Sequence, residues 1–255
     1  MFTDTHCHFS EHEGYDRDGA YLRAIEGGVD LMVDVAFDVK SSFSCRDFAE
    51  GKKGVYFTAG IHPDASEEAT EENLIKITPV FSSNKCLGVG EIGLDYHYGK
   101  DKDVQKKAFV RQIEFASALN LPFAVHSREC TEDIVKILKD NAHHIKNGAI
   151  MHCYSGSVET AKILLDLGFY ISFSGTLTFK NARQLPEVCA YLPTDRILSE
   201  TDSPYLAPVP LRGTVNEPKN VALVTEKIAQ IKNLTVSETA KIIRDNTLNL
   251  FKKLK

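Results

Sequence analysis

Eight short segments rich in β-forming residues alternate with longer amphipathic segments from one end of the 255-residue chain to the other. Their starts, from residue 2 to residue 197, are separated by about 28 residues on average, close to the length of one βα unit. Several are nearly continuous apolar runs, such as residues 31–36, which is typical of strands covered on both faces in a parallel sheet. The predicted strands are residues 2–8, 31–37, 55–62, 86–95, 122–127, 149–155, 170–175 and 197–204.

Eight βα units in a chain of this length predict a closed (β/α)8 TIM barrel, because a doubly wound sheet usually has fewer strands and an open edge. No linker or break in composition divides the chain, so we expect a single domain over residues 1–255. Residues 217–232 and 237–254 are predicted to form the last helix and one extra helix. The proline-rich segment 204–218 follows the eighth strand and should overhang the C-terminal mouth of the barrel.

Composition excludes several other classes of protein. There is no apolar run of about 18 residues, so no membrane span is expected, and the first residues do not resemble a secretory signal. The six cysteines are dispersed and form no Cys-x-x-Cys motif, which predicts reduced thiols and a cytoplasmic protein. The net charge of −5 offers no general attraction to a polyanion, so a nucleic-acid substrate would have to be held locally.

Histidines and carboxylates gather at the predicted C-terminal ends of the strands. His6 and His8 are two residues apart on the first strand and should share one face, with Cys7 on the other. In a closed barrel these strand ends converge on one opening. The other residues of this kind are His62, Glu91, His126, His152 and Asp202.

Six of these residues, all except His62, exceed the three or four protein ligands that one zinc-like ion takes, so they predict two divalent metal ions. A carboxylate can bridge two metals about 3.5–4 Å apart, and we assign that role to Glu91. Asp202 is also the candidate general base, because it would lie beside the attacking water. The predicted ligands are His6, His8 and Asp202 for one ion and His126 and His152 for the other, with Glu91 shared between them.

A single histidine at a strand end is more often a hydrogen-bonded polar residue than a metal ligand. The combination of histidines and carboxylates on five strands, each at the functional end, favours a metal centre instead. Imidazole ligands favour zinc, manganese or cobalt over magnesium, which prefers oxygen ligands. We therefore expect a transition metal in the isolated protein and activation by zinc, manganese or magnesium.

Several motifs, in order along nearly the whole chain, resemble those of the TatD-type metal-dependent deoxyribonucleases, a family of amidohydrolase-like barrels. They are DTHCH at 4–8, GIHP at 60–63, GEIGLD at 90–95, HSRE at 126–129, HCYSG at 152–156, ETDSPYLAP at 200–208, RG at 212–213 and NEP at 216–218.

The resemblance implies a hydrolase that cleaves phosphodiester bonds in DNA, as an exonuclease acting on single-stranded ends, and it implies the same six metal ligands. It also implies that His62 contacts a substrate phosphate. Arg128 and Arg212 are candidate phosphate-binding residues, because a guanidinium can hold two oxygens at once, although either arginine could instead form an ordinary ion pair. No protein partner can be inferred.

Two other functions use the same residues. One is the deacylation of aminoacyl-tRNA, or hydrolysis of another ester or amide, because one fold supports many chemistries. The other is a non-catalytic scaffold that binds metal for structure, which the open-mouthed site disfavours. Some amidohydrolases that attack cyclic amides bridge their metals with a carbamylated lysine on strand 4. This strand has Glu91 and no lysine, which favours phosphoester hydrolysis.

Overall fold

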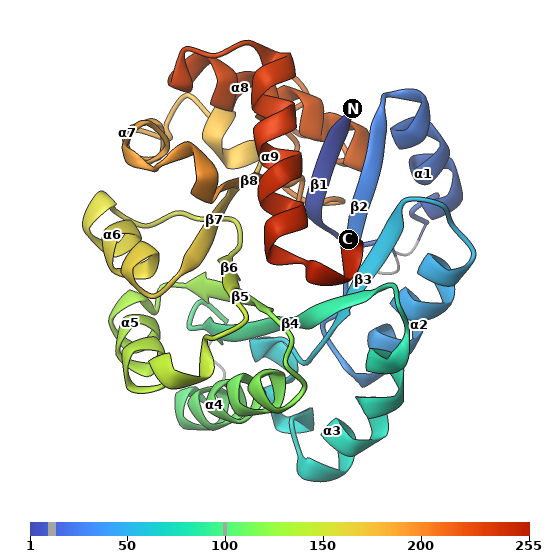
Figure 1. Cartoon of the computed structure of the whole chain (residues 1–255), viewed down its shortest axis with the longest axis vertical. Helices are drawn as coiled ribbons and strands as arrows, with labels where there is room; N and C mark the ends of the chain where they lie inside the picture. The colour runs from blue at the N-terminus through green and yellow to red at the C-terminus, as the bar shows by residue number, and fades with distance from the viewer. Residues whose placement is uncertain (10–13, 99–100) are drawn as a thin grey trace.

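Eight parallel strands form one sheet at the centre of the molecule, and helices surround it (Figure 1). The computed structural model describes residues 1–9, 14–98 and 101–255. Each strand pairs with the next along the chain, from β1 to β8, so the predicted TIM barrel is confirmed. The strands are β1 (Phe2–Cys7), β2 (Val29–Val35), β3 (Val55–Ala59), β4 (Cys86–Asp95), β5 (Phe123–Arg128), β6 (Ala149–Met151), β7 (Phe169–Phe173) and β8 (Ile197–Ser199).

Helices follow the strands in the expected alternation. Helix α6 begins and ends at the residue types that the sequence indicates. The Ser157 hydroxyl accepts a hydrogen bond from the Thr160 N–H at its start, and Gly168, with φ of 86°, follows its end. The helices are α1 (Arg17–Glu26), α2 (Val39–Glu50), α3 (Glu71–Ile77), α4 (Lys102–Ala118), α5 (Thr131–Asp140), α6 (Val158–Asp166), α7 (Gln184–Tyr191), α8 (Val221–Lys232) and α9 (Val236–Leu250).

Side chains and loop residues close the barrel between its first and last strands. The Thr5 hydroxyl donates to the Ser199 carbonyl at 3.1 Å, and the Ser199 hydroxyl donates to the Thr3 carbonyl at 3.0 Å. Beyond the ends of the strands, the Asp202 N–H donates to the His6 carbonyl at 2.9 Å. The residues that carry chemistry on β1 and after β8 are therefore tied directly to one another.

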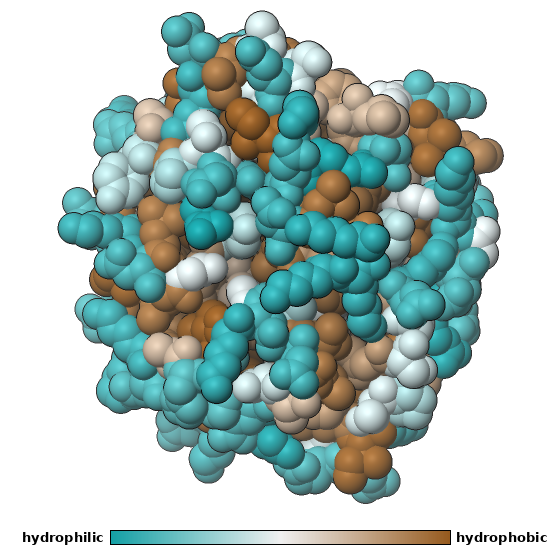
Figure 2. Space-filling view, viewed as in Figure 1, coloured by the Kyte–Doolittle hydropathy of each residue, from teal (hydrophilic) through white to brown (hydrophobic). Residues whose placement is uncertain are grey.

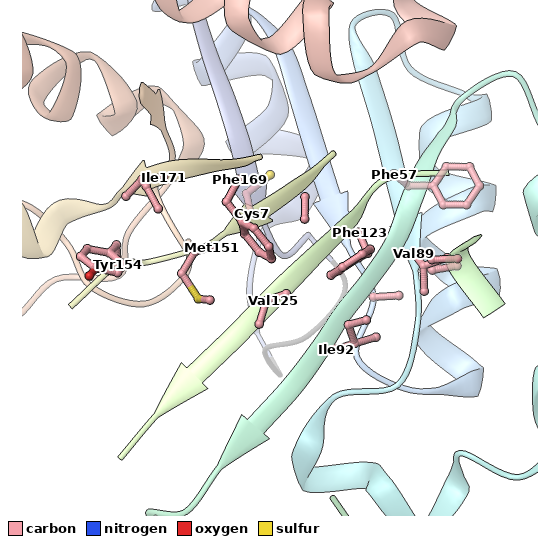
Figure 3. Packing of buried hydrophobic residues seen from close by; sticks show 14 of the residues in the cluster. Cys7, Phe57, Val89, Ile92, Phe123, Val125, Met151, Tyr154, Phe169 and Ile171 are labelled. Carbon is pink, nitrogen blue, oxygen red and sulfur yellow. The ribbon is translucent and has the colours of Figure 1, made fainter. Parts of the chain in front are cut away.

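Alternate strand residues pack into two apolar clusters. The larger cluster contains strand residues such as Phe123 and Phe169 (Figure 3). It also contains residues of the surrounding helices. The smaller cluster contains strand residues, among them Leu31 and Val33, together with Leu250 and Phe251 at the end of α9. Since it contains no residue of the surrounding helices α1 to α8, it fills the barrel interior.

Helix α9 crosses the end of the barrel that faces the viewer in Figure 1. Hydrophilic residues predominate on this face, with hydrophobic residues scattered among them (Figure 2). Within the described part of the chain, no helix is both long and apolar enough to cross a membrane. None of the six cysteines, all of them among the described residues, forms a disulfide.

Several predicted strands are too long at their C-terminal ends. The ladder of β6 stops at Met151 rather than residue 155, and that of β8 stops at Ser199 rather than residue 204. The physical reason is a sharp turn after each strand, where Cys153 (φ 42°) and Asp202 (φ 56°) adopt left-handed conformations that no strand accommodates. Strands 2 and 3 likewise end two to three residues before the predicted limits of 37 and 62.

The last two helices also differ in extent from the prediction. Residues Pro218–Asn220 form a 3-10 turn, so α8 begins at Val221 rather than at residue 217. Proline lacks the N–H that a continuous helix needs beyond its first turn. Helix α9 ends at Leu250, and Lys252–Leu254 forms a separate 3-10 turn.

Candidate metal centre at the barrel mouth

His6 and His8 lie on one face at the end of β1, as the sequence predicts. His8 follows the last strand residue directly, and the two Nε2 atoms are 3.3 Å apart. Cys7 faces the other way: its thiol donates to the Val33 carbonyl, and its side chain belongs to the larger apolar cluster, between the strands and the helices. The pair therefore presents two imidazole nitrogens to a common point.

Glu91 lies between two pairs of histidines. Its Oε1 atom is 2.7 Å from His126 Nδ1 and 2.7 Å from His152 Nε2. Its Oε2 atom is 3.5 Å from His6 Nε2 and 4.0 Å from His8 Nε2. Each carboxylate oxygen thus faces a different pair of rings, which is the arrangement that a bridging carboxylate requires.

Asp202 completes the half of the centre formed by β1. Its Oδ1 atom is 3.4 Å from His8 Nε2 and 3.8 Å from His6 Nε2. The left-handed turn after β8, together with the hydrogen bond from the Asp202 N–H to the His6 carbonyl, brings this carboxylate back over the barrel.

Three of the four histidines predicted as metal ligands have a fixed partner on their second nitrogen. His8 Nδ1 is 2.8 Å from the Val35 carbonyl oxygen, and His152 Nδ1 is 3.2 Å from Glu200 Oε1. His126 Nε2 is 3.0 Å from Asp95 Oδ2. Histidines that bind metals almost always donate their other N–H to a carbonyl or carboxylate, which fixes the ring and its tautomer.

Asp95 and Glu200 were not assigned roles from the sequence. Both are buried, and both occur in the motifs quoted above, four residues after Glu91 and two before Asp202. The sequence feature that could have identified them is an acidic residue in a predicted buried strand close to a candidate ligand, since acidic residues are rarely buried without a partner.

The carboxylates of Glu91 and Asp202 carry negative charge. Burial opposes ionisation of Glu91, but the charges at His152 and His6 outweigh it and hold its pKa well below the usual range. Burial also opposes ionisation of Asp202, yet its hydrogen bond with His8 and the charge at His152 lower its pKa. Anionic oxygens beside imidazole nitrogens suit a divalent cation.

The donor atoms fit metal binding. Three groups have ligand atoms that all lie within 4.8 Å of one another, which is close enough to share an ion. The groups are His6, His152 and Asp202; His6, His8 and Glu91; and His62, Glu91 and His126.

His62 belongs to one of these groups, a role that the sequence did not give it. Its ring lies edge-on to that of His126, with 4.5 Å between centroids. Burial and the neighbouring His126 lower the pKa of His62 to about 3, so the ring is neutral at physiological pH. A neutral ring can serve as either a ligand or a hydrogen-bond donor to substrate.

Arg128 is the last residue of β5, and Arg212 lies in the segment between β8 and α8; both are exposed. Each guanidinium rests on an aromatic ring of a loop that follows a strand. Arg128 lies 5.1 Å from the centroid of Tyr98, and Arg212 lies 3.6 Å from that of Phe179. The rings hold the two cations in place without neutralising them.

A TIM barrel with this cluster of imidazoles and carboxylates at its C-terminal mouth has the architecture of a metal-dependent hydrolase. The chain belongs to the TatD-related DNase family, whose model matches residues 3–252. It is 41% identical to the metal-dependent hydrolase YabD of Bacillus subtilis, over 99% of each chain.

Two proteins of Escherichia coli K12 are also similar. The metal-dependent hydrolase YcfH is 38% identical over 98% of this chain and 96% of its own length. The crystal structure of YJJV, a TatD homologue, superimposes with a TM-score of 0.90 at 29% identity and covers 98% of each chain. This chain is therefore a metal-dependent hydrolase of the TatD family.

Proposed function

We propose that this protein hydrolyses phosphodiester bonds of DNA, beginning at single-stranded ends, with two divalent cations in its centre. The observation that carries the proposal is the position of Glu91, whose two oxygens face separate histidine pairs. A pair of cations bridged in this way suits phosphoryl transfer, because it can neutralise both the attacking and the leaving oxygen. The name of the family model supports DNA as the substrate.

Each residue at the mouth then has a defined task. His6, His8 and Asp202 would hold one cation, His126 and His152 the other, and Glu91 both. Bound cations of this kind lower the pKa of water and neutralise charge on the phosphoryl group.

Asp202 accepts the proton of the attacking water through its carboxylate, which is ionised and partly open to solvent. His62, Arg128 and Arg212 bind phosphate oxygens of the substrate around the centre. The low exposure of His6, His8 and Glu91 excludes bulk water and strengthens these interactions.

The test is a cleavage assay on an end-labelled single-stranded oligonucleotide. A chelator should abolish cleavage, and zinc, manganese or magnesium added in excess should restore it. Glu91→Gln should lower kcat about 10³-fold, because removal of the bridging charge costs several kcal/mol of transition-state stabilisation. Glu226→Gln, a change at an exposed position of α8, is the matched control.

A charged tRNA incubated in parallel distinguishes the rival ester hydrolysis. Release of the amino acid without release of nucleotides from DNA would contradict the proposal. So would chelator-resistant cleavage, or a Glu91→Gln protein that cleaves DNA at the wild-type rate.

A further inference from the structure

Two exposed tyrosines flank the mouth of the barrel. Tyr98 (62% exposed) follows β4 by three residues, and Tyr205 (45% exposed) follows Asp202 by three. Strands β4 and β8 are four positions apart in the eight-stranded order, so the two rings stand on opposite sides of the metal centre. Tyr191 is the one other tyrosine among the described residues with comparable exposure, and it ends α7 at the opposite end of the barrel.

Tyr205 is fixed relative to the catalytic carboxylate. Its N–H donates to the Asp202 carbonyl at 2.9 Å, and its own carbonyl accepts from Asn216 Nδ2 at 2.7 Å. The same Asn216 amide also donates to the Thr201 carbonyl, so the loop is anchored on both sides of Asp202. The Tyr205 ring centroid is 6.3 Å from that of His8, within reach of the nucleotide next to a phosphate bound at the centre.

Tyr98 stands beside a phosphate-binding candidate. The Arg128 guanidinium lies 5.1 Å from its ring centroid and donates to its hydroxyl at 3.3 Å. The His97 ring meets Tyr98 edge-on, with 4.9 Å between centroids. An exposed aromatic ring next to an exposed cation is the combination that single-strand-binding proteins use to stack a base and hold its phosphate.

We propose that Tyr205 and Tyr98 are stacking platforms for the two nucleobases that flank the scissile phosphodiester, so that specificity for unpaired strands is built into the mouth. The inference rests on the proposed function and adds the residues by which the site recognises unpaired ends. In a duplex both faces of each internal base are already stacked on neighbouring bases. The tyrosine rings could therefore stack on these bases only after the end of the duplex is unpaired. Stacking also tolerates any sequence, because every base has a π-face.

The experiment compares steady-state cleavage, by the metal-loaded full chain, of two oligonucleotides of equal length. One carries all its bases, and the other is abasic at the last three nucleotides of each end. With the base-containing strand, Tyr205→Ala and Tyr98→Ala should each raise KM about tenfold with kcat nearly unchanged, as expected for a lost stacking contact. With the abasic strand, both variants should match the wild type. Tyr205→Phe, which keeps the ring, should behave as wild type.

Tyr191→Ala controls for the loss of an exposed tyrosine far from the mouth, and thermal unfolding checks that each variant is folded. If wild-type protein cleaves DNA but neither alanine variant raises KM on the base-containing strand, the platforms are refuted and the proposed function stands. Equal KM values for blunt duplex and single strand would also overturn the inference. A wild-type protein that cleaves no DNA refutes the proposed function and the inference together.

Discussion

At the scale of single residues, Glu200 shows how a buried side chain outside the ligand set fixes the orientation of a histidine in the centre. Its side chain is fully buried, and Oε1 accepts a hydrogen bond from the Cys153 N–H at 2.6 Å while facing His152 Nδ1 at 3.2 Å. One oxygen thus fixes both the left-handed turn after β6 and the ring orientation of His152. Asp95 Oδ2, 3.0 Å from His126 Nε2, likewise fixes the ring orientation of His126.

Glu200→Gln should lower metal affinity or activity by about 10- to 100-fold, the usual cost of losing the partner of a metal-binding histidine. The amide keeps the shape of the side chain, so the fold should persist while the hold on His152 weakens. Calorimetric titration of the apoprotein with zinc or manganese measures the affinity. Glu226→Gln serves again as the control, and equal affinities for the Glu200 variant and wild type would show that this contact does not support the centre.

At the scale of elements, α9 closes the end of the barrel opposite the metal centre. The helix begins with a capping box, in which Thr235 and Glu238 satisfy each other's backbone N–H groups. It ends with Leu250 and Phe251 inserted against the interior residues of the strands. The extra helix that follows the eight βα units is therefore part of the core.

Leu250→Ala should lower the free energy of unfolding by about 3 kcal/mol, because the side chain is 3% exposed and its removal leaves a cavity in the barrel interior. Denaturation in urea measures the change. Leu22→Ala removes the same atoms from a residue that is 58% exposed and should change the stability by well under 1 kcal/mol. A similar loss in both variants would argue against an interior role for α9.

At the scale of the whole molecule, the distribution of charge suits binding of an anionic substrate by a few cations near the centre. The net charge is −5, and the centre itself contributes buried carboxylates. The cations proposed to meet phosphate are Arg128 and Arg212, each held on an aromatic ring at the mouth. If DNA is the substrate, as we propose, this distribution of charge predicts that the protein engages a strand end through few phosphates rather than along a basic groove.

Binding of a single-stranded oligonucleotide should accordingly depend weakly on salt. Two phosphate contacts by cationic side chains, with His62 neutral, predict a slope of about −1.4 for log K against log salt concentration. Arg128→Ala or Arg212→Ala should each make the slope shallower by about 0.7. Fluorescence anisotropy of a labelled strand measures the slope. Lys136→Ala, at an exposed site on α5, should leave it unchanged. A slope of about −4 or steeper would indicate a longer electrostatic footprint.

The order of elements and the ligand candidates could be predicted because both depend on patterns within short segments of the sequence. Period and spacing mark a strand, and His-x-His at 6 and 8 places two imidazoles on one face of it. The ends of β6 and β8 could not be placed, since no glycine marks the turns that follow them and the left-handed residues there are Cys153 and Asp202.

The sequence by itself therefore determined the barrel, the strand on which or just after which each candidate metal ligand lies, and the end of the barrel where the candidates meet. Only the tertiary structure decided that each oxygen of Glu91 faces a different histidine pair, that Glu200 and Asp95 lie behind His152 and His126, and that His62 reaches the centre. The reason is geometric. Strand period fixes the direction of a side chain along its own segment, whereas distances across the mouth depend on how eight strands close and how each following loop turns.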